Sequence, residues 1–211
     1  MEFSENCTIC PRLSNFLAEV KIEYPDYHCK PVSPFGVKSP KLLIVGLAPG
    51  KHGANATGRP FTGDHAGILL YQTMHKTGFS NQPESSHRKD GLKLIDACIT
   101  NAVKCLPPEN KPTTEEVNVC NGYLAKELKA LSPNTVVLAL GTIAHRAVLR
   151  AFGLTLSHYQ FGHAVEHELP GDLTLLDSYH CSRYNTQTRR LTEDMFVNVF
   201  ERARAIISSN G

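Results

Sequence analysis

Four short apolar runs alternate along the chain with longer stretches in which apolar residues recur at helical spacing. The runs cover residues 41–46, 95–101, 135–141 and 173–179. Runs of this kind, rich in β-branched residues and apolar on both faces, are typical of strands buried in a parallel sheet. The amphipathic stretches predict helices at residues 66–77, 113–131, 142–152 and 191–208.

This alternation of strands and helices predicts an α/β protein. Strands joined by right-handed crossovers give a parallel sheet with helices on both faces, so we expect a three-layer α/β/α sandwich around a four-stranded parallel sheet. Thr113 and Glu116 have the spacing of a capping box at the start of the second helix. A length of 211 residues with 41% hydrophobic content fits a single domain spanning residues 1–211.

Charge and hydropathy exclude some classes of protein. The net charge is only +2, which argues against a binder of nucleic acid that acts through overall charge, and any basic surface must be local. Three arginines fall within residues 179–191. No apolar run approaches the length of a membrane span, and the first residues lack the basic start and apolar core of a leader. We expect a soluble, cytoplasmic monomer with no membrane contact.

The segment from Gly46 to Asp64, GLAPGKHGANATGRPFTGD, holds five glycines and two prolines directly after the first apolar run. Glycine at this density predicts a backbone that approaches a ligand closely. The segment superficially resembles a phosphate-binding loop, but only three residues separate Gly46 from Gly50, and Lys51 precedes a histidine. A Walker A loop needs four residues there and a serine or threonine after the lysine.

Ligands of open parallel sheets bind outside the carboxyl ends of the strands. This rule brings the Gly46 segment together with Asn101 and residues 180–185. An asparagine amide matches the edge of an amide-like ring, a histidine such as His180 can donate to a carbonyl oxygen, and Phe61 offers a stacking face. Each has an ordinary alternative, since asparagine often satisfies backbone groups, phenylalanine usually packs in a core, and Asp64 has the position of a helix cap. Their convergence favours a site.

Four cysteines from two segments could share a metal. Cys7 and Cys10 form a C-x2-C motif, whereas Cys105 and Cys120 are separated by fourteen residues. A zinc site and an iron–sulfur cluster both remain open on this spacing, although structural zinc modules more often pair two short-spaced motifs. The remaining cysteines, Cys29, Cys98 and Cys181, have no spacing that argues for a ligand.

Three motifs together, GLAPGKHGANATGRPFTGD, ITNAVKCLPP and HCSRYN, resemble the uracil-DNA glycosylase superfamily, and specifically its family 5, the type B enzymes. The resemblance extends from Cys7 to about Leu191. It implies an enzyme that flips uracil, and other deaminated bases such as hypoxanthine, out of DNA and hydrolyses the N-glycosidic bond without a lyase step. It also implies that Cys7, Cys10, Cys105 and Cys120 hold a [4Fe-4S] cluster with a structural role.

The same resemblance implies roles for individual residues. Asp64, His180 and Asn101 are the expected catalytic residues, with Asp64 acting on water or on the cationic sugar. The flipped base would be bound by Gly46, Leu47, Phe61, Asn101 and His180. Contacts to DNA are expected from Lys51, His52, Asn55, Arg59, Arg183, Tyr184 and Asn185, of which the last three would enter the duplex.

Two positions bear on the substrate. Ala48 stands where other families of the superfamily carry a side chain that activates water, which resembles the type B pattern and its broader specificity. Cys181 stands where the family's loop usually has proline, so the backbone is freer there and strand preference is in doubt. Two other hypotheses remain, an iron–sulfur module that binds nucleic acid without catalysis and a zinc-dependent hydrolase of nucleotides.

Overall fold

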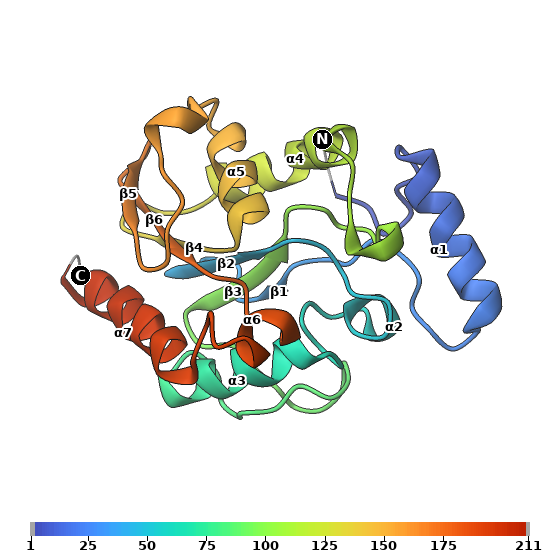
Figure 1. Cartoon of the computed structure of the whole chain (residues 1–211), viewed down its shortest axis with the longest axis horizontal. Helices are drawn as coiled ribbons and strands as arrows, with labels where there is room; N and C mark the ends of the chain where they lie inside the picture. Colours follow the sequence, from blue (N-terminus) through green and yellow to red (C-terminus); the bar gives the residue numbers. More distant parts are fainter. Residues whose placement is uncertain (1–2, 210–211) are drawn as a thin grey trace.

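The protein is described here by a computed structural model covering residues 3–209, in which one sheet lies between two layers of helices (Figure 1). The strands are β1 (Phe35–Gly36), β2 (Leu42–Gly46), β3 (Ala97–Asn101), β4 (Val136–Leu140), β5 (Glu166–Leu169) and β6 (Leu173–Ser178). Their order across the sheet is β1-β3-β2-β4-β6-β5.

The sheet is mixed and has six strands, which corrects the expectation of a four-stranded parallel sheet. The four strands predicted from apolar runs are its central strands, and they pair in parallel. β1 and β5 pair antiparallel at the two edges. Neither edge strand could be predicted from apolar runs. β1 has only two residues, and β5, EHEL, is largely polar with only Leu169 fully buried.

The described chain contains α1 (Pro11–Glu23), α2 (Ala54–Thr57), α3 (His65–Lys76), α4 (Thr114–Lys129), α5 (Thr142–Ala151), α6 (Arg183–Gln187) and α7 (Glu193–Ser209), with 3-10 turns η1 (Pro108–Asn110) and η2 (Leu156–His158). The four expected helices are confirmed as α3, α4, α5 and α7. The capping box of α4 is present, with Thr113 accepting from the Glu116 amide and Glu116 accepting from the Thr113 amide. The helices α1, α2 and α6 were not predicted.

Each face of the sheet has its own apolar core. One core packs α1, α4 and α5 against the sheet through residues such as Leu13, Leu124 and Val148, and the other packs α3 and α7 through Leu70 and Phe200. Within the described residues, no helix combines the length and the apolar content that crossing a membrane requires.

The register of the central strands fixes where the functional segments meet. Gly46 at the end of β2 lies beside Asn101 at the end of β3, and β6 ends at Ser178, two residues before His180. The three segments singled out in the sequence therefore leave the sheet at the same edge.

Candidate active site

A cavity of about 670 Å³ opens at the carboxyl ends of the strands. It is large enough to admit a nucleobase with part of its sugar. Eight of the residues expected to bind substrate or DNA line it, namely Leu47, Lys51, His52, Phe61, Asp64, Asn101, His180 and Arg183. The convergence predicted from the sheet rule is thus observed.

Phe61 is held in the cavity wall by two glycines. Its backbone has φ +52°, a left-handed conformation that bulky residues rarely adopt. A Cβ atom on Gly46 would approach Phe61 ring carbons to 2.7 Å, and one on Gly67 in α3 would collide with the Phe61 carbonyl group. The absence of side chains at both glycines therefore allows the ring to lie directly against the end of β2.

Asn101 presents an unpaired amide in the cavity. The residue is only 3% exposed, and its Oδ1 atom is buried without a hydrogen-bond partner. A Cβ atom on Gly46 would also collide with this oxygen. An unpaired buried amide costs free energy, about 1–3 kcal/mol, which a ligand with complementary groups would recover.

The two carboxylate oxygens of Asp64 have different surroundings: one caps a helix, and the other faces the cavity. Its Oδ1 accepts a hydrogen bond of 2.9 Å from the Gly67 amide, which confirms the helix cap at the start of α3. Its Oδ2 faces Gly50 and Gly53, both of which line the cavity. Burial raises the pKa of Asp64, although hydrogen bonds from the amides of Gly67 and Ala66 oppose the rise.

His180 faces Phe61 across the same cavity. The two rings lie 6.0 Å apart between centroids with an interplanar angle of 29°. Burial lowers the pKa of His180 to about 4, so its imidazole is neutral near pH 7. The Asn185 amide group donates to the His180 carbonyl oxygen at 2.8 Å and fixes the backbone there. Asn185 therefore supports the site from behind rather than lining it.

Lys51 and His52 lie at the mouth of the cavity against the end of α1. Lys51 Nζ is 2.9 Å from a Glu23 carboxylate oxygen and 4.9 Å from the centroid of the Tyr24 ring. His52 Nδ1 is hydrogen-bonded to the Tyr27 hydroxyl at 2.9 Å. The unpredicted helix α1 thus anchors the glycine-rich segment that contains both residues.

Two of the residues expected to contact DNA are buried instead. The side chain of Asn55 is inaccessible, and its amide donates to Cys29 Sγ at 3.5 Å. Arg59 is 4% exposed and forms an ion pair of 2.9 Å with Asp90, which is also buried. Burial raises the pKa of Asp90, but hydrogen bonds from the Leu92 amide and from Arg59 outweigh it and lower the pKa to about 2. Both residues stabilise the segment rather than reach a ligand.

The segment after β6 forms the short helix α6 rather than an open loop. Ser182 caps it by accepting from the Asn185 amide, while Arg183 and Tyr184 are exposed, Tyr184 at 70%. Cys181, at the position expected to loosen this segment, is completely buried. The cavity wall also includes His65, Ala66 and Asn110, which lie outside the segments that the sequence indicated. Of these, His65 follows the recognisable cap at Asp64 directly.

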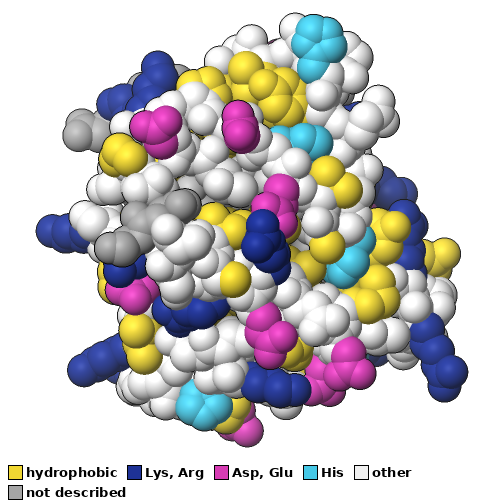
Figure 2. Space-filling model, turned by 90° about the vertical axis from the view of Figure 1, so that its left-hand side faces the viewer, with side chains coloured by type: hydrophobic (Ala, Val, Ile, Leu, Met, Phe, Trp, Pro, Cys, Tyr) yellow, Lys and Arg dark blue, Asp and Glu magenta, His cyan; other side chains and the backbone are white. Residues whose placement is uncertain are grey.

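Charge on one side of the molecule is mixed. On the face at the left of Figure 1, basic and acidic side chains alternate and form no continuous basic patch (Figure 2). A nucleic-acid contact is therefore better sought around the cavity, where Arg183 and Lys51 lie.

Cys7, Cys10, Cys105 and Cys120 line a second, closed cavity between α1, the segment after β3 and α4. The Lys104 amide donates to Cys120 Sγ at 3.3 Å, and the Tyr123 hydroxyl donates to Cys7 Sγ at 3.2 Å. Such bonds favour thiolate ligands. Burial, followed by repulsion from the other cysteines, raises the pKa of Cys105 to about 12, so this thiol loses its proton near pH 7 only when a metal ion binds it.

No three of the four cysteine sulfur atoms lie within 4.8 Å of one another. Over residues 3–209, the one group of three or more His, Cys, Asp or Glu side chains compact enough to hold a single ion contains no cysteine. A zinc ion with four thiolates requires such a compact group, because each Zn–S distance is only about 2.3 Å. A polynuclear cluster fits four cysteines that surround a cavity at wider spacing.

The chain matches one protein-family model and several known proteins over most of its length. Residues 33–204 match the family model described as the uracil DNA glycosylase superfamily. The chain is 45% identical over 205 residues to the type-5 uracil-DNA glycosylase of Thermus thermophilus, covering 95% of this chain and 93% of the relative. It is 42% identical to the type-5 enzyme of Pyrobaculum aerophilum, with coverages of 95% and 88%. Identity to the type-4 enzyme of Archaeoglobus fulgidus is 33%, with coverages of 79% and 78%.

Proposed function

The chain belongs to the uracil-DNA glycosylase superfamily, and from this membership we propose that its large cavity receives a uracil flipped out of DNA and that the protein hydrolyses the N-glycosidic bond. The observation that carries the proposal is the meeting of Phe61, Asn101, Asp64 and His180 in that cavity. Extrusion of the base costs stacking and pairing energy, which contacts inside the cavity must offset. The product is an abasic site.

Recognition of the base falls to Phe61 and Asn101. The Phe61 ring supplies a stacking face, and the unpaired Asn101 amide can both accept from the ring N–H of uracil and donate to the adjacent carbonyl oxygen. Leu47 lines the same cavity, and Gly46 lies directly against the Phe61 ring and the Asn101 side chain. Cytosine presents the opposite donor and acceptor pattern on this edge, so the same amide disfavours it.

Charge stabilisation falls to His180. Bond cleavage leaves negative charge on the pyrimidine, and a neutral imidazole N–H can donate to the carbonyl oxygen that gains this charge. The lowered pKa of His180 keeps the ring neutral at the pH where the enzyme works.

Activation of water falls to Asp64. Its Oδ1 is engaged with the Gly67 amide, while Oδ2 faces the glycines of the cavity wall and is available to orient a water molecule or to stabilise the cationic sugar. Ala48 lines the cavity without a polar group. Asp64 therefore takes the role that another side chain at position 48 would otherwise have.

The substrate range and the DNA contacts are further parts of the proposal. The space beside Ala48 suits larger deaminated bases such as hypoxanthine. Arg183 and Tyr184 on α6, with Lys51 and His52 at the cavity mouth, would contact the DNA around the extruded nucleotide. We take the chain to act as a single domain and as a monomer.

The four cysteines fit a [4Fe-4S] cluster. Their sulfurs surround one closed cavity, two of them accept hydrogen bonds, and their spread exceeds that of a single-ion site. Such a cluster would cross-link the start of α1 to α4. Its role would be structural, and it would take no part in the steps assigned to Asp64 and His180. Iron and acid-labile sulfide in equal amounts in the purified protein would support it, whereas zinc in their place would refute it.

The function is tested with a panel of DNA duplexes that contain uracil, hypoxanthine or a mismatched thymine. We expect uracil release, followed by strand breakage only after alkali treatment, and release of hypoxanthine at a lower rate. Breakage without alkali would reveal a lyase step. Tight binding of the uracil duplex with no base release would instead identify a non-catalytic binding module.

A further inference from the structure

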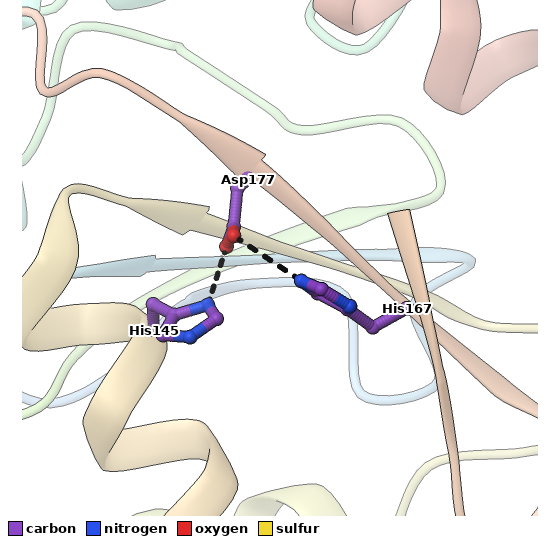
Figure 3. A group of neighbouring side chains, drawn as sticks. All are labelled: His145, His167 and Asp177. Atoms are coloured by element: carbon purple, nitrogen blue, oxygen red, sulfur yellow. Dashed lines mark hydrogen bonds and ion pairs between the residues drawn. The ribbon is translucent and has the colours of Figure 1, made fainter. Parts of the chain in front are cut away.

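A compact group of three side chains lies at the β5 edge of the sheet, outside the substrate cavity (Figure 3). His145 comes from α5, His167 from β5 and Asp177 from β6. One potential ligand atom from each side chain lies within 4.8 Å of the others. We refer to these residues as the His–His–Asp group. Neither the expected cluster nor the proposed catalytic steps use it.

Asp177 is the least satisfied member of the His–His–Asp group. Its side chain is fully buried, and its Oδ2 atom accepts no hydrogen bond. His167 Nε2 lies 3.8 Å from Oδ2, which is too long for a hydrogen bond. A buried carboxylate with an unpaired oxygen is costly unless a positive charge lies against it.

The hydrogen bonds of His145 lead to the same requirement. Its Nε2 is 3.1 Å from the Tyr159 carbonyl oxygen, which can only accept, so Nε2 carries a hydrogen. In a neutral imidazole the Nδ1 atom is then a lone-pair acceptor, yet Nδ1 lies 2.9 Å from Asp177 Oδ1. Two acceptors at this distance need a proton or a metal ion. A histidine that donates its other N–H to a backbone carbonyl is the usual arrangement of a metal ligand.

His167 and the neighbouring backbone complete a possible coordination shell. His167 Nε2 is 3.1 Å from the Gln160 carbonyl oxygen, so by the same rule it donates to that oxygen. A bound ion would take the place of this hydrogen, which moves to Nδ1, and would have both Nε2 and the carbonyl oxygen within reach. The rings of Phe161 and Tyr159 pack edge-on against His145 and His167, each with centroids 5.5 Å apart. These rings shield the group from water, as in a structural rather than a catalytic metal site.

We propose that the His–His–Asp group binds one divalent transition-metal ion, best matched by zinc, which joins α5 to the β5–β6 hairpin. Two imidazoles and a carboxylate suit zinc, whereas magnesium and calcium prefer shells made only of oxygen. The ion would neutralise Asp177 and satisfy both histidine nitrogens. It would also steady the strand that runs into His180, three positions beyond Asp177.

The test uses the whole protein with its cysteine-bound cofactor in place. Zinc is added, unbound metal is removed by gel filtration, and the retained zinc is measured by elemental analysis and by X-ray absorption at the zinc edge. We expect one zinc per chain with nitrogen and oxygen ligands at about 2.0–2.2 Å and a higher melting temperature. His167→Gln should abolish zinc retention and the rise in melting temperature, while His158→Gln at an exposed histidine should change neither.

Three results would overturn the proposal. The first is a protein that retains no zinc, and the second is zinc bound by sulfur at about 2.3 Å, which would place it on the cysteines. The third is equal zinc retention by the wild type and by His167→Gln. The spectrum of the wild-type protein is informative on its own, so the test does not depend on the folding of any variant.

Discussion

At the scale of single residues, the glycines of the Gly46 segment have a more specific role than binding a ligand with their backbone. Gly46 makes room for Phe61 and Asn101, and Gly53 makes room for Asp64. The sequence predicted that the segment approaches something closely. It could not show that the close partners are functional side chains from other parts of the chain, because that depends on the register of β2 against β3.

Replacing Gly46 by alanine tests this role. Gly46 ends a strand, where alanine is tolerated, but the new Cβ would lie 2.7 Å from the Phe61 ring and also against the Asn101 amide. We expect Gly46→Ala to lower the rate of uracil release by roughly 10²-fold, because a displacement of about 1 Å can cost that much.

Gly50→Ala is the comparison variant for Gly46→Ala, since its Cβ would lie 3.5 Å from Asp64 Oδ2, an ordinary contact, and has no contact with Phe61 or Asn101. Single-turnover rates and melting temperatures of both variants should be compared. If Gly46→Ala retained the wild-type rate, the fit of Phe61 and Asn101 against Gly46 would have no bearing on catalysis.

The pKa of His180 gives a second prediction at this scale. With a pKa of about 4 in the folded protein against about 6.5 when unfolded, the unfolded chain binds more protons between these values. This residue therefore lowers stability as pH falls from about 6.5 to about 4. Its imidazole should remain neutral, and its contribution to the rate unchanged, from about pH 8 to about pH 5.

Nuclear magnetic resonance of the histidine rings measures this titration directly, with His180→Asn used to assign the signal. A His180 resonance that titrates near pH 6.5 would contradict the neutral donor assigned to this residue.

At the scale of elements, apolar periodicity predicted the strands and helices that form the two cores, but not the shorter elements around them. The central strands and the helices α3, α4, α5 and α7 all carry long apolar patterns. The edge strands and the helices α2 and α6 are too short to show a period, so tertiary contacts decide them. The helix α1 is thirteen residues long, but only Leu13, Leu17 and Val20 are buried, so its apolar pattern is weak.

The role of Arg59 is set by its contact with another segment and not by the motif in which it lies. From the motif this residue was expected to contact DNA, but its ion pair with Asp90 joins the glycine-rich segment to the polar stretch at residues 80–91. Arg59→Ala would remove the cationic partner of the Asp90 carboxylate, which would keep only hydrogen bonds from backbone amides. We therefore expect the free energy of unfolding to fall by about 3 kcal/mol, the low end for breaking a buried ion pair. The salt dependence of DNA binding should not change. Denaturant unfolding and binding titrations at several salt concentrations measure the two effects.

Arg183→Ala is the contrasting variant, because Arg183 is exposed at the cavity mouth. It should keep wild-type stability and reduce the slope of log affinity against log salt by about one. If Arg59→Ala instead reduced the slope of log affinity against log salt and left stability unchanged, Arg59 would contact DNA after all.

At the scale of the whole molecule, two apolar cores on one sheet support a site made from three segments that are distant in sequence. The alternation of strands and helices predicted this edge of the sheet, and the motifs predicted most of the side chains in the cavity. The burial of Asn55 and Arg59 was not predictable, because neither composition nor spacing reveals a buried partner. The division of Asp64 between a cap and an open oxygen likewise required the structure.

The most direct test of the central claim is the single-turnover rate of uracil release by Asp64→Asn. Asparagine keeps an oxygen that can cap α3 but removes the charge, so folding and DNA affinity should be retained. We expect the rate to fall by about 10²–10⁴-fold, while Asp26→Asn at an exposed aspartate stays at the wild-type rate. A wild-type rate in Asp64→Asn would contradict the assignment of this cavity and this carboxylate to hydrolysis.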